Sequence, residues 1–252
     1  MFADDCLSGK RILVTGASSG LGRETAIYLS RCGAQVVLAG RDETRLMDSV
    51  AQLDGKGHEK ITADISTADA ADEMVKQVVA SLGPLHGLFY SAGESVLAPV
   101  RATKSAQLEQ AFGAGFFGAF GAARALSRKG AMADGGSIVF MSSVSATRGR
   151  RGMAAYSASK AAVGGLVRTL AIELAPRDIR VNAISAGAVV TAMHDQFADT
   201  VSDEMVTNYR DLHLLGFGRS EDIAYSAIFL MSEASRWITG QNIPIDGGYT
   251  AK

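Results

Sequence analysis

Short runs of β-branched and aliphatic residues alternate along the chain with longer segments in which apolar positions recur at helical spacing. The short runs predict strands at residues 11–14, 35–39, 61–63, 87–90, 137–141, 180–184 and 242–245. The longer segments predict helices at residues 23–31, 43–53, 68–81, 105–128, 154–174 and 221–231. Because apolar strands alternate with helices, we expect a doubly wound α/β fold, with a parallel sheet covered by helices on both faces.

No Pro- or Ser-rich linker and no internal repeat divides the 252 residues, so the pattern predicts a single domain over 1–252. The composition, 47% hydrophobic with a mean hydropathy of +0.13, allows a sizeable buried core. A net charge of -1 and a pI near 6.4 argue against nucleic acid or a membrane surface as the main partner.

The cysteines and histidines give no sign of a metal site. Cys6 and Cys32 have neither zinc-ligand nor Cys-x-x-Cys spacing, and the four histidines are scattered. The acidic N-terminus lacks the apolar core of a signal peptide. No apolar run reaches the ~18 residues that a membrane span needs. We therefore expect a cytoplasmic protein without a metal ion.

A glycine-rich turn, residues 15–22, follows the first predicted strand and opens the first helix. Glycines there permit a sharp turn and let the backbone approach a pyrophosphate, whose charge the helix N-terminus favours. An ordinary glycine-rich turn is the alternative, but the position after an N-terminal strand favours a dinucleotide site. The residues predicted to bind the cofactor in this turn are Gly16, Ser18, Ser19, Gly20, Leu21 and Gly22.

The end of the second strand bears on the choice between NAD(H) and NADP(H). NAD binders place Asp or Glu there for the ribose hydroxyls, whereas this chain has Gly40 followed by Arg41. A guanidinium suits a 2′-phosphate, so NADP(H) is favoured, with a solvated loop charge as the alternative for Arg41. Further cofactor contacts are predicted at the ends of the third and fourth strands, at Asp64, Ile65, Ser91, Ala92 and Gly93.

Tyr156 and Lys160 lie four residues apart on a predicted helix and therefore project from the same face. A nearby ammonium favours a phenolate and would move the tyrosine pKa from ~10 toward the working range. Ser143, thirteen residues before Tyr156 at the end of a strand-like run, can hold a carbonyl or alcohol oxygen. The alternative is a solvated Tyr–Lys pair on an exposed helix face, and the presence of Ser143 upstream argues against that alternative.

The glycine turn, Ser143, the Tyr156/Lys160 pair and the ending at residues 238–248 together resemble the short-chain dehydrogenase/reductase family, including its 3-oxoacyl-carrier-protein reductase-like members. The resemblance covers residues 8–250 in order and spacing. It implies a Rossmann-type seven-stranded sheet and hydride transfer between a nicotinamide cofactor and a carbonyl or alcohol. Many members of the family are homodimers or homotetramers.

The same resemblance implies a role for each site residue. Tyr156 would donate or accept the proton, and Ser143 would position the substrate oxygen. Lys160 would bind the nicotinamide ribose and lower the pKa of the tyrosine. The loop at residues 185–191 is similar to the family loop that meets the nicotinamide carboxamide, through the Val189 backbone and the Thr191 hydroxyl.

The chain departs from the family pattern at three places. Tyr90-Ser91 stands where the family has Asn-Asn, and Ala186 where it has Pro. Gly115 aligns with the fourth catalytic residue, an asparagine thought to hold a water that resupplies protons to Lys160. Three interpretations of this glycine-rich helix are open. The proton relay is remodelled, or the glycines allow close packing against the catalytic helix with its small side chains, or Gly115 is not the position that corresponds to the asparagine.

Two segments bear on the substrate. Residues 190–216 are expected to form a lid over the substrate. The apolar residues of this segment are compatible with acyl, steroid-like and sugar substrates alike. The basic segment 148–151 is either a solvated loop or a site for an anionic group of a small-molecule carbonyl or alcohol substrate. That group would be a nucleotide-sugar phosphate, an acyl-carrier phosphopantetheine or a carboxylate. An NADP(H)-binding sensor or scaffold without turnover is the alternative to an enzyme.

Overall fold

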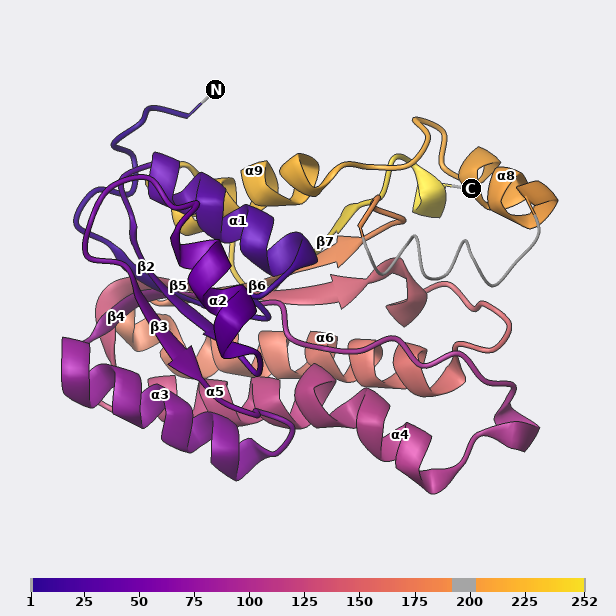
Figure 1. Cartoon of the computed structure of the whole chain (residues 1–252), viewed down its shortest axis with the longest axis horizontal. Coiled ribbons are helices and arrows are strands. Elements are labelled where there is room, and N and C mark those ends of the chain that lie inside the picture. Colours follow the sequence, from indigo (N-terminus) through magenta and orange to yellow (C-terminus); the bar gives the residue numbers. More distant parts are fainter. Residues whose placement is uncertain (1, 192–202, 252) are drawn as a thin grey trace.

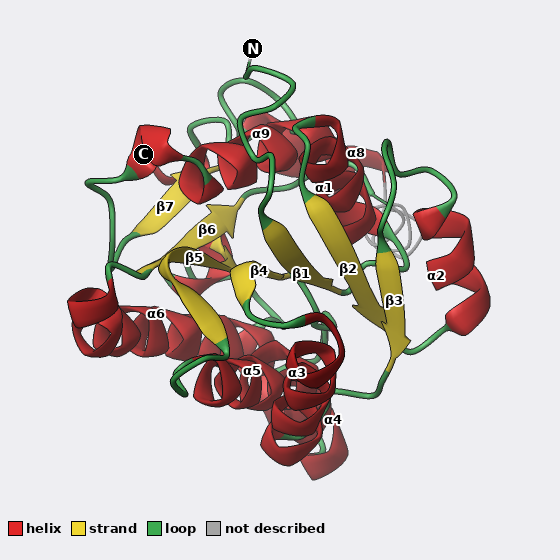
Figure 2. Cartoon of the chain, turned by 90° about the vertical axis from the view of Figure 1, so that its left-hand side faces the viewer, coloured by secondary structure: helices red, strands yellow, loops and turns green. Residues whose placement is uncertain are grey.

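The computed structural model describes residues 2–191 and 203–251, which form a seven-stranded sheet with helices on both faces (Figures 1 and 2). Every strand pair is parallel, and the strand order is β3-β2-β1-β4-β5-β6-β7. The strands are β1 (Arg11–Thr15), β2 (Gln35–Gly40), β3 (Glu59–Thr62), β4 (Leu85–Tyr90), β5 (Met132–Ser143), β6 (Arg180–Ala186) and β7 (Asn242–Ile245). The predicted doubly wound, parallel fold is confirmed.

Helices α1 and α9 cover one face of the sheet, and α3, α5 and α6 cover the other, as Figure 2 shows. Alternate strand residues supply the two cores, so Leu13 faces α3 and α5 while its neighbours Ile12 and Val14 face α1 and α9. The helices are α1 (Gly20–Arg31), α2 (Glu43–Val50), α3 (Ala68–Leu82), α4 (Ser105–Phe112), α5 (Gly118–Leu126), α6 (Ala154–Leu174), α8 (Asp203–Asp211) and α9 (Ser220–Met231). Within the described residues, no helix has the length and hydropathy of a membrane span.

The prediction of one unbroken helix over residues 105–128 is wrong. A π-helical turn, Gly113–Phe117, separates α4 from α5 and is closed by a hydrogen bond from the Gly118 N–H to the Gly113 carbonyl. The Tyr90 hydroxyl donates to the Ala114 carbonyl within this turn, at 2.7 Å. A buried side chain at the end of β4 thus inserts into the helical ladder, which is a known cause of such interruptions.

Close packing explains most of the glycines in this helix, but the partner differs from the predicted one. A Cβ on Gly118 would lie 2.2 Å from the Ile65 carbonyl oxygen, and one on Gly121 would lie 2.0 Å from that of Ala68. Both contacts are far below any tolerated separation, so a side chain is excluded at either position. The close partner is the segment from the end of β3 to the first residue of α3, not helix α6.

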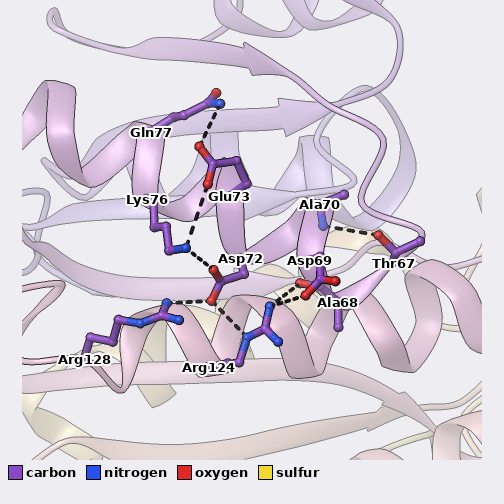
Figure 3. Close-up of polar contacts among 10 residues, drawn as sticks. All are labelled: Thr67, Ala68, Asp69, Ala70, Asp72, Glu73, Lys76, Gln77, Arg124 and Arg128. Atoms are coloured by element: carbon purple, nitrogen blue, oxygen red, sulfur yellow. Dashed lines mark hydrogen bonds and ion pairs between the residues drawn. The ribbon is translucent and has the colours of Figure 1, made fainter.

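A buried carboxylate, Asp72 of α3, holds α3 and α5 together at this crossing (Figure 3). It accepts hydrogen bonds from Arg124 Nε at 3.0 Å and Arg128 Nη1 at 2.6 Å, and pairs with Lys76 Nζ at 2.7 Å. Burial alone would raise its pKa, but the bonds from Lys76, Arg128 and Arg124 hold the pKa well below its usual range.

We expect Asp72→Asn to lower the free energy of unfolding by about 1–3 kcal/mol, because it removes charge-assisted bonds at a buried site. Since the folded pKa is depressed, this stabilisation is present above pH ~4 and is lost as the pH falls further. Urea denaturation between pH ~7 and ~3 measures both effects. Asp69→Asn, at a carboxylate that is 92% exposed, is the control. An equal cost for the two variants would contradict a special role for Asp72.

Candidate active site

The predicted site residues gather at the carboxyl end of the sheet, where doubly wound folds bind ligands. The turn after β1 is shaped by glycines there, because Gly16 and Gly20 have positive φ angles of 66° and 52°. A Cβ on Gly22 would lie 2.3 Å from the Gly16 carbonyl oxygen, so α1 begins in direct contact with the turn. Only glycine fits at this junction.

The first turn of α1 is open to an anion. Ser19 is the N-cap residue and makes no side-chain capping bond, so the first N–H groups of α1 lack that partner. The positive end of the helix dipole also favours an anion at this position. The backbone cradle of Gly16, Gly20, Leu21 and Gly22 therefore fits a dinucleotide pyrophosphate.

Thr15 fastens the end of β1 to the loop after β4. Its Oγ1 accepts from the Ser91 N–H at 3.1 Å and the Ala92 N–H at 3.2 Å. A Cβ on Gly16 would lie 3.0 Å from the Ala92 nitrogen, so the two loops touch through their backbones. The predicted cofactor residues Ser91 and Ala92 are thus brought to the glycine turn by a threonine that the sequence reasoning did not select.

Arg41 lies at the end of β2, as predicted, but it is not a solitary loop charge. Its Nη2 pairs with Glu94 Oε1 at 2.6 Å, and Gln110 Nε2 donates to the other oxygen of Glu94 at 2.6 Å. The bond from Gln110 and the pair with Arg41 hold the pKa of Glu94 below its usual range. Sequence reasoning missed Glu94, although its position directly after Ser91-Ala92-Gly93 could have indicated it.

Ser18 and Asp64 are close to this ion pair. A Cβ on Gly40 would lie 3.5 Å from Ser18 Oγ, so the bare backbone at the end of β2 faces the serine. Asp64 is exposed, its Oδ1 accepts from the Ser66 N–H, and its charge acts on Glu94. Ile65 is buried beneath it. Arg41, Asp64 and Ser18, all predicted cofactor residues, therefore lie near the end of β2.

The three predicted catalytic residues come from two neighbouring elements. Ser143 ends β5, while Tyr156 and Lys160 lie in the first turns of α6. Two bonds fix the helix to the strand: Lys160 Nζ donates to the Met141 carbonyl at 3.0 Å, and Ser142 Oγ donates to the Lys160 carbonyl at 3.1 Å. Ser142 is a second positioning residue that sequence reasoning did not select.

The Tyr156 pKa shifts in the direction opposite to the one expected from Lys160. Burial raises the pKa of Tyr156, a hydrogen bond with the Ser143 side chain lowers it in part, and the nearby Tyr209 phenol raises it again. Lys160 Nζ lies 5.9 Å from the centre of the tyrosine ring. Lys160 is itself buried, and burial lowers its pKa to about 8. Burial therefore raises the pKa of Tyr156 and lowers that of Lys160.

Gly115 lies beside the lysine. A Cβ on Gly93 would lie 3.3 Å from Lys160 Nζ and 3.6 Å from the Gly115 Cα. A Cβ on Gly115 itself would meet only Ser159 within 4 Å, at an ordinary contact distance of 3.6 Å from Oγ. Unlike Gly118 and Gly121, Gly115 is therefore not required by close packing.

The loop after β6 presents Val189 backbone to the same edge. The Val190 N–H and the Ala188 carbonyl bond to Gly218, so the N–H and carbonyl of Val189 point to the opposite side. Thr191 is half-buried at the end of this loop. The backbone of Val189 is thus oriented as a ligand contact requires.

The predicted lid region contains α8, but Met193, His194 and Phe197 lie outside the described residues. The basic segment is not simply solvated, because the Arg150 guanidinium carbon lies 3.8 Å from the centre of the Tyr209 ring. Arg148 lies 6.0 Å above Tyr249. Two arginines of this segment therefore contact aromatic rings of α8 and of the segment near the C-terminus.

Comparisons with known proteins agree with this geometry. A family model described as "Enoyl-(Acyl carrier protein) reductase" matches residues 16–250. Glucose 1-dehydrogenase of Gluconobacter oxydans is 36% identical over 98% of this chain and 94% of its own length. The 3-oxoacyl-(acyl-carrier-protein) reductase of Staphylococcus aureus is 34% identical over 95% of this chain and 97% of its own.

Two solved structures share the fold along nearly their whole length. A short-chain dehydrogenase/reductase of Serratia marcescens superposes with a TM-score of 0.90 at 29% identity, covering 97% of this chain and 99% of the other. A blue fluorescent protein from a metagenomic library, in complex with NADPH, gives 0.88 at 29% identity, covering 96% and 98%. Together with the glycine turn and the Ser143, Tyr156 and Lys160 cluster, these matches establish that the chain belongs to the short-chain dehydrogenase/reductase family of oxidoreductases.

Proposed function

We propose that this protein is an NADP(H)-dependent oxidoreductase that interconverts a carbonyl and a secondary alcohol, with Tyr156 as general acid and base. One observation carries the proposal: Tyr156 and the buried Lys160 of α6 are fastened to the end of β5, where Ser143 lies, at the same edge of the sheet as a backbone cradle that fits a dinucleotide. A small carbonyl oxygen placed between the Tyr156 and Ser143 hydroxyls would receive a hydrogen bond from each. The cradle of α1 and the Val189 loop hold the cofactor that supplies the hydride.

Each residue of the chain has one task in this mechanism. In the reduction, the Tyr156 hydroxyl gives its proton to the substrate oxygen as negative charge develops there. Ser143 orients that oxygen and stabilises its charge. Lys160, anchored to the Met141 carbonyl, stabilises the phenolate that remains and returns a proton to it. Lys160 is buried and Tyr156 is half-buried, so little water screens these interactions.

Tyr156→Phe removes the proton donor and keeps the ring, so we expect kcat to fall by about 10²–10⁴-fold. NADPH affinity should change little, because the cradle is untouched. Loss of NADPH absorbance with 3-oxoacyl thioesters, keto-sugars and simple ketones measures turnover, and NADPH fluorescence measures binding. Ser226→Ala, at a half-buried serine whose hydroxyl donates to the Asp222 carbonyl within α9, is the control. Full activity of Tyr156→Phe would exclude this tyrosine as the acid.

The NADP(H) preference is supported by Arg41 and Ser18, and by Gly40 where an acidic residue would repel a 2′-phosphate. NADPH in a structurally similar protein supports it as well. In the structure Arg41 is paired with Glu94, so a 2′-phosphate would have to compete with that carboxylate.

Two opposite changes test this competition. Arg41→Leu should weaken NADPH binding by about tenfold or more, because a charge-assisted contact with the phosphate is lost. Glu94→Gln should tighten NADPH binding by about two- to fivefold, because the guanidinium is released. Neither change should alter NADH binding by more than about twofold. Kd values from fluorescence titration measure these effects, and equal weakening of both cofactors by Arg41→Leu would contradict the assignment.

The proton relay is proposed to run without the family asparagine. Gly115 lies next to Lys160 and leaves room for a water, and no packing requirement explains the glycine. We expect Gly115→Asn to keep the fold and not to lower kcat, since its Cβ meets only Ser159 at 3.6 Å. Circular dichroism and steady-state turnover check the two parts. A large loss of turnover in a folded variant would contradict this account of the relay.

An NADP(H)-binding sensor without turnover is the second candidate, and the glycine at position 115 is the observation that favours it. The sensor hypothesis predicts NADPH binding with no turnover on any carbonyl of the panel.

A cytoplasmic homodimer or homotetramer is also proposed. The exposed side chains of Phe117 and Phe120 near α6 support self-association, and the free thiols of Cys6 and Cys32 support a reducing compartment.

A further inference from the structure

A buried imidazole, His213, lies just beyond the end of α8 and bonds to the loop that follows β6. The residue is 3% exposed. Its Nε2 accepts the Ala188 N–H, and its Nδ1 bonds to the Tyr209 carbonyl, both at 3.0 Å. A ring nitrogen that faces a carbonyl must carry the proton, and one that faces an N–H must lack it. The two bonds therefore select one neutral tautomer of His213.

The loop that His213 contacts is the one that carries Val189. Main-chain bonds hold it on both sides of this residue, because the Gly218 N–H donates to the Ala188 carbonyl at 2.9 Å and the Val190 N–H donates to the Gly218 carbonyl at 3.0 Å. His213 adds a side-chain bond at the Ala188 N–H, one residue before Val189. A change at the imidazole therefore acts directly on the backbone next to Val189.

Aromatic rings enclose the imidazole. The centroids of Tyr209, Phe217 and Tyr249 lie 5.1, 5.6 and 4.7 Å from its own. A phenyl ring would fill the same space and keep these ring contacts, but it offers no acceptor to the Ala188 N–H. Packing thus accounts for an aromatic ring at position 213, and the bond to the loop accounts for its nitrogen.

Burial keeps this ring neutral. It lowers the pKa of His213, while the bond to the Tyr209 carbonyl and the charge of Asp246 raise the pKa and Arg150 lowers it. Together with the two tyrosine phenols, these are the titratable and charged groups that face the ring. The net shift is downward from the ordinary value of ~6.5. Protonation places an N–H at Nε2, so the bond to Ala188 is lost as the pH falls through the depressed value.

We propose that His213 is a positioning residue for the nicotinamide half of the cofactor, because its neutral imidazole holds the loop at residues 187–190 through the Ala188 N–H. The proposal rests on the function proposed above, in which the Val189 backbone meets the carboxamide. Without the acceptor, a donor at the buried Ala188 has no partner, and the loop must shift to satisfy it. The glycine turn after β1 and the end of β2, which hold the adenosine half, keep their own contacts.

Two variants separate the nitrogen from the ring. His213→Phe keeps the ring and removes the acceptor, whereas His213→Gln places an amide oxygen near the position of Nε2 without a titratable group. We expect His213→Phe to weaken NADPH binding by about five- to fiftyfold and to leave binding of adenosine 2′,5′-bisphosphate within about twofold. His213→Gln should recover most of the loss. Isothermal titration calorimetry measures both Kd values.

A matched control removes the same kind of bond elsewhere. His86 Nδ1 accepts the Arg11 N–H at 3.0 Å, at the amino end of the sheet and opposite the candidate site. His86→Phe should therefore change neither Kd. In the protein without cofactor, hydrogen exchange of the Ala188 amide should be faster in His213→Phe than in the wild type and unchanged in His86→Phe.

The pH dependence tests the same bond in the wild type. The ratio of the NADPH Kd to the adenosine 2′,5′-bisphosphate Kd should rise as the pH falls from ~7 to ~5, and it should stay flat in His213→Gln. Both ligands carry a 2′-phosphate, so the titration of that phosphate cancels in the ratio. A rise of the same size in His213→Gln would exclude this imidazole as the source.

Binding and turnover together distinguish this inference from the proposed function. Unchanged NADPH affinity and unchanged Ala188 protection in a folded His213→Phe variant would overturn the inference and leave the oxidoreductase intact. Equal weakening of NADPH and adenosine 2′,5′-bisphosphate would also overturn it, because the damage would then extend to the adenosine half. NADPH binding that depends on His213, with no turnover of any carbonyl, would support the inference and sink the enzyme proposal.

Discussion

The attachment of α6 to the end of β5 is the interaction on which the candidate site depends. Lys160 contributes to it twice, through its ammonium on the Met141 carbonyl and through its own carbonyl on Ser142. Because both bonds are buried, losing either would leave an unsatisfied polar group at a cost of about 1–3 kcal/mol. The direction in which Tyr156 points is therefore set by a residue one turn away, which makes Lys160 structural as well as electrostatic.

The second constraint is the close approach of backbones on the α3–α5 side of the sheet. Gly118 and Gly121 let the helix lie against the segment after β3, at an intrinsic cost of ~1 kcal/mol each relative to alanine. The same approach places the π turn, with Gly115, against Ser159 and near Lys160. Packing at Gly118 and Gly121 thus positions the helical turn that lies beside Lys160.

The fold could be predicted from sequence because strand and helix periodicities differ and because the apolar strands are continuous. The α6 boundaries, 154–174, and the last strand were predicted to the residue, since each is bounded by clear breaks in the pattern. The π turn was not predictable, because it arises from the Tyr90 hydroxyl reaching the Ala114 carbonyl across the structure. The glycines correctly indicated close packing of this helix, but periodicity does not show which segment packs against them.

The candidate site residues could be selected from the sequence, but their electrostatics could not be predicted from it. Charge pairs between distant segments, such as Arg41 with Glu94, leave no periodic signal, and desolvation, not the lysine that sequence spacing suggested, sets the direction of the Tyr156 pKa shift. The Arg41–Glu94 pair has one more consequence. Salt screens the attraction of an exposed arginine for a phosphate, but it screens the competing carboxylate as well. These two effects oppose each other, so cofactor affinity in this protein should depend on ionic strength less steeply than in a relative whose arginine has no acidic neighbour.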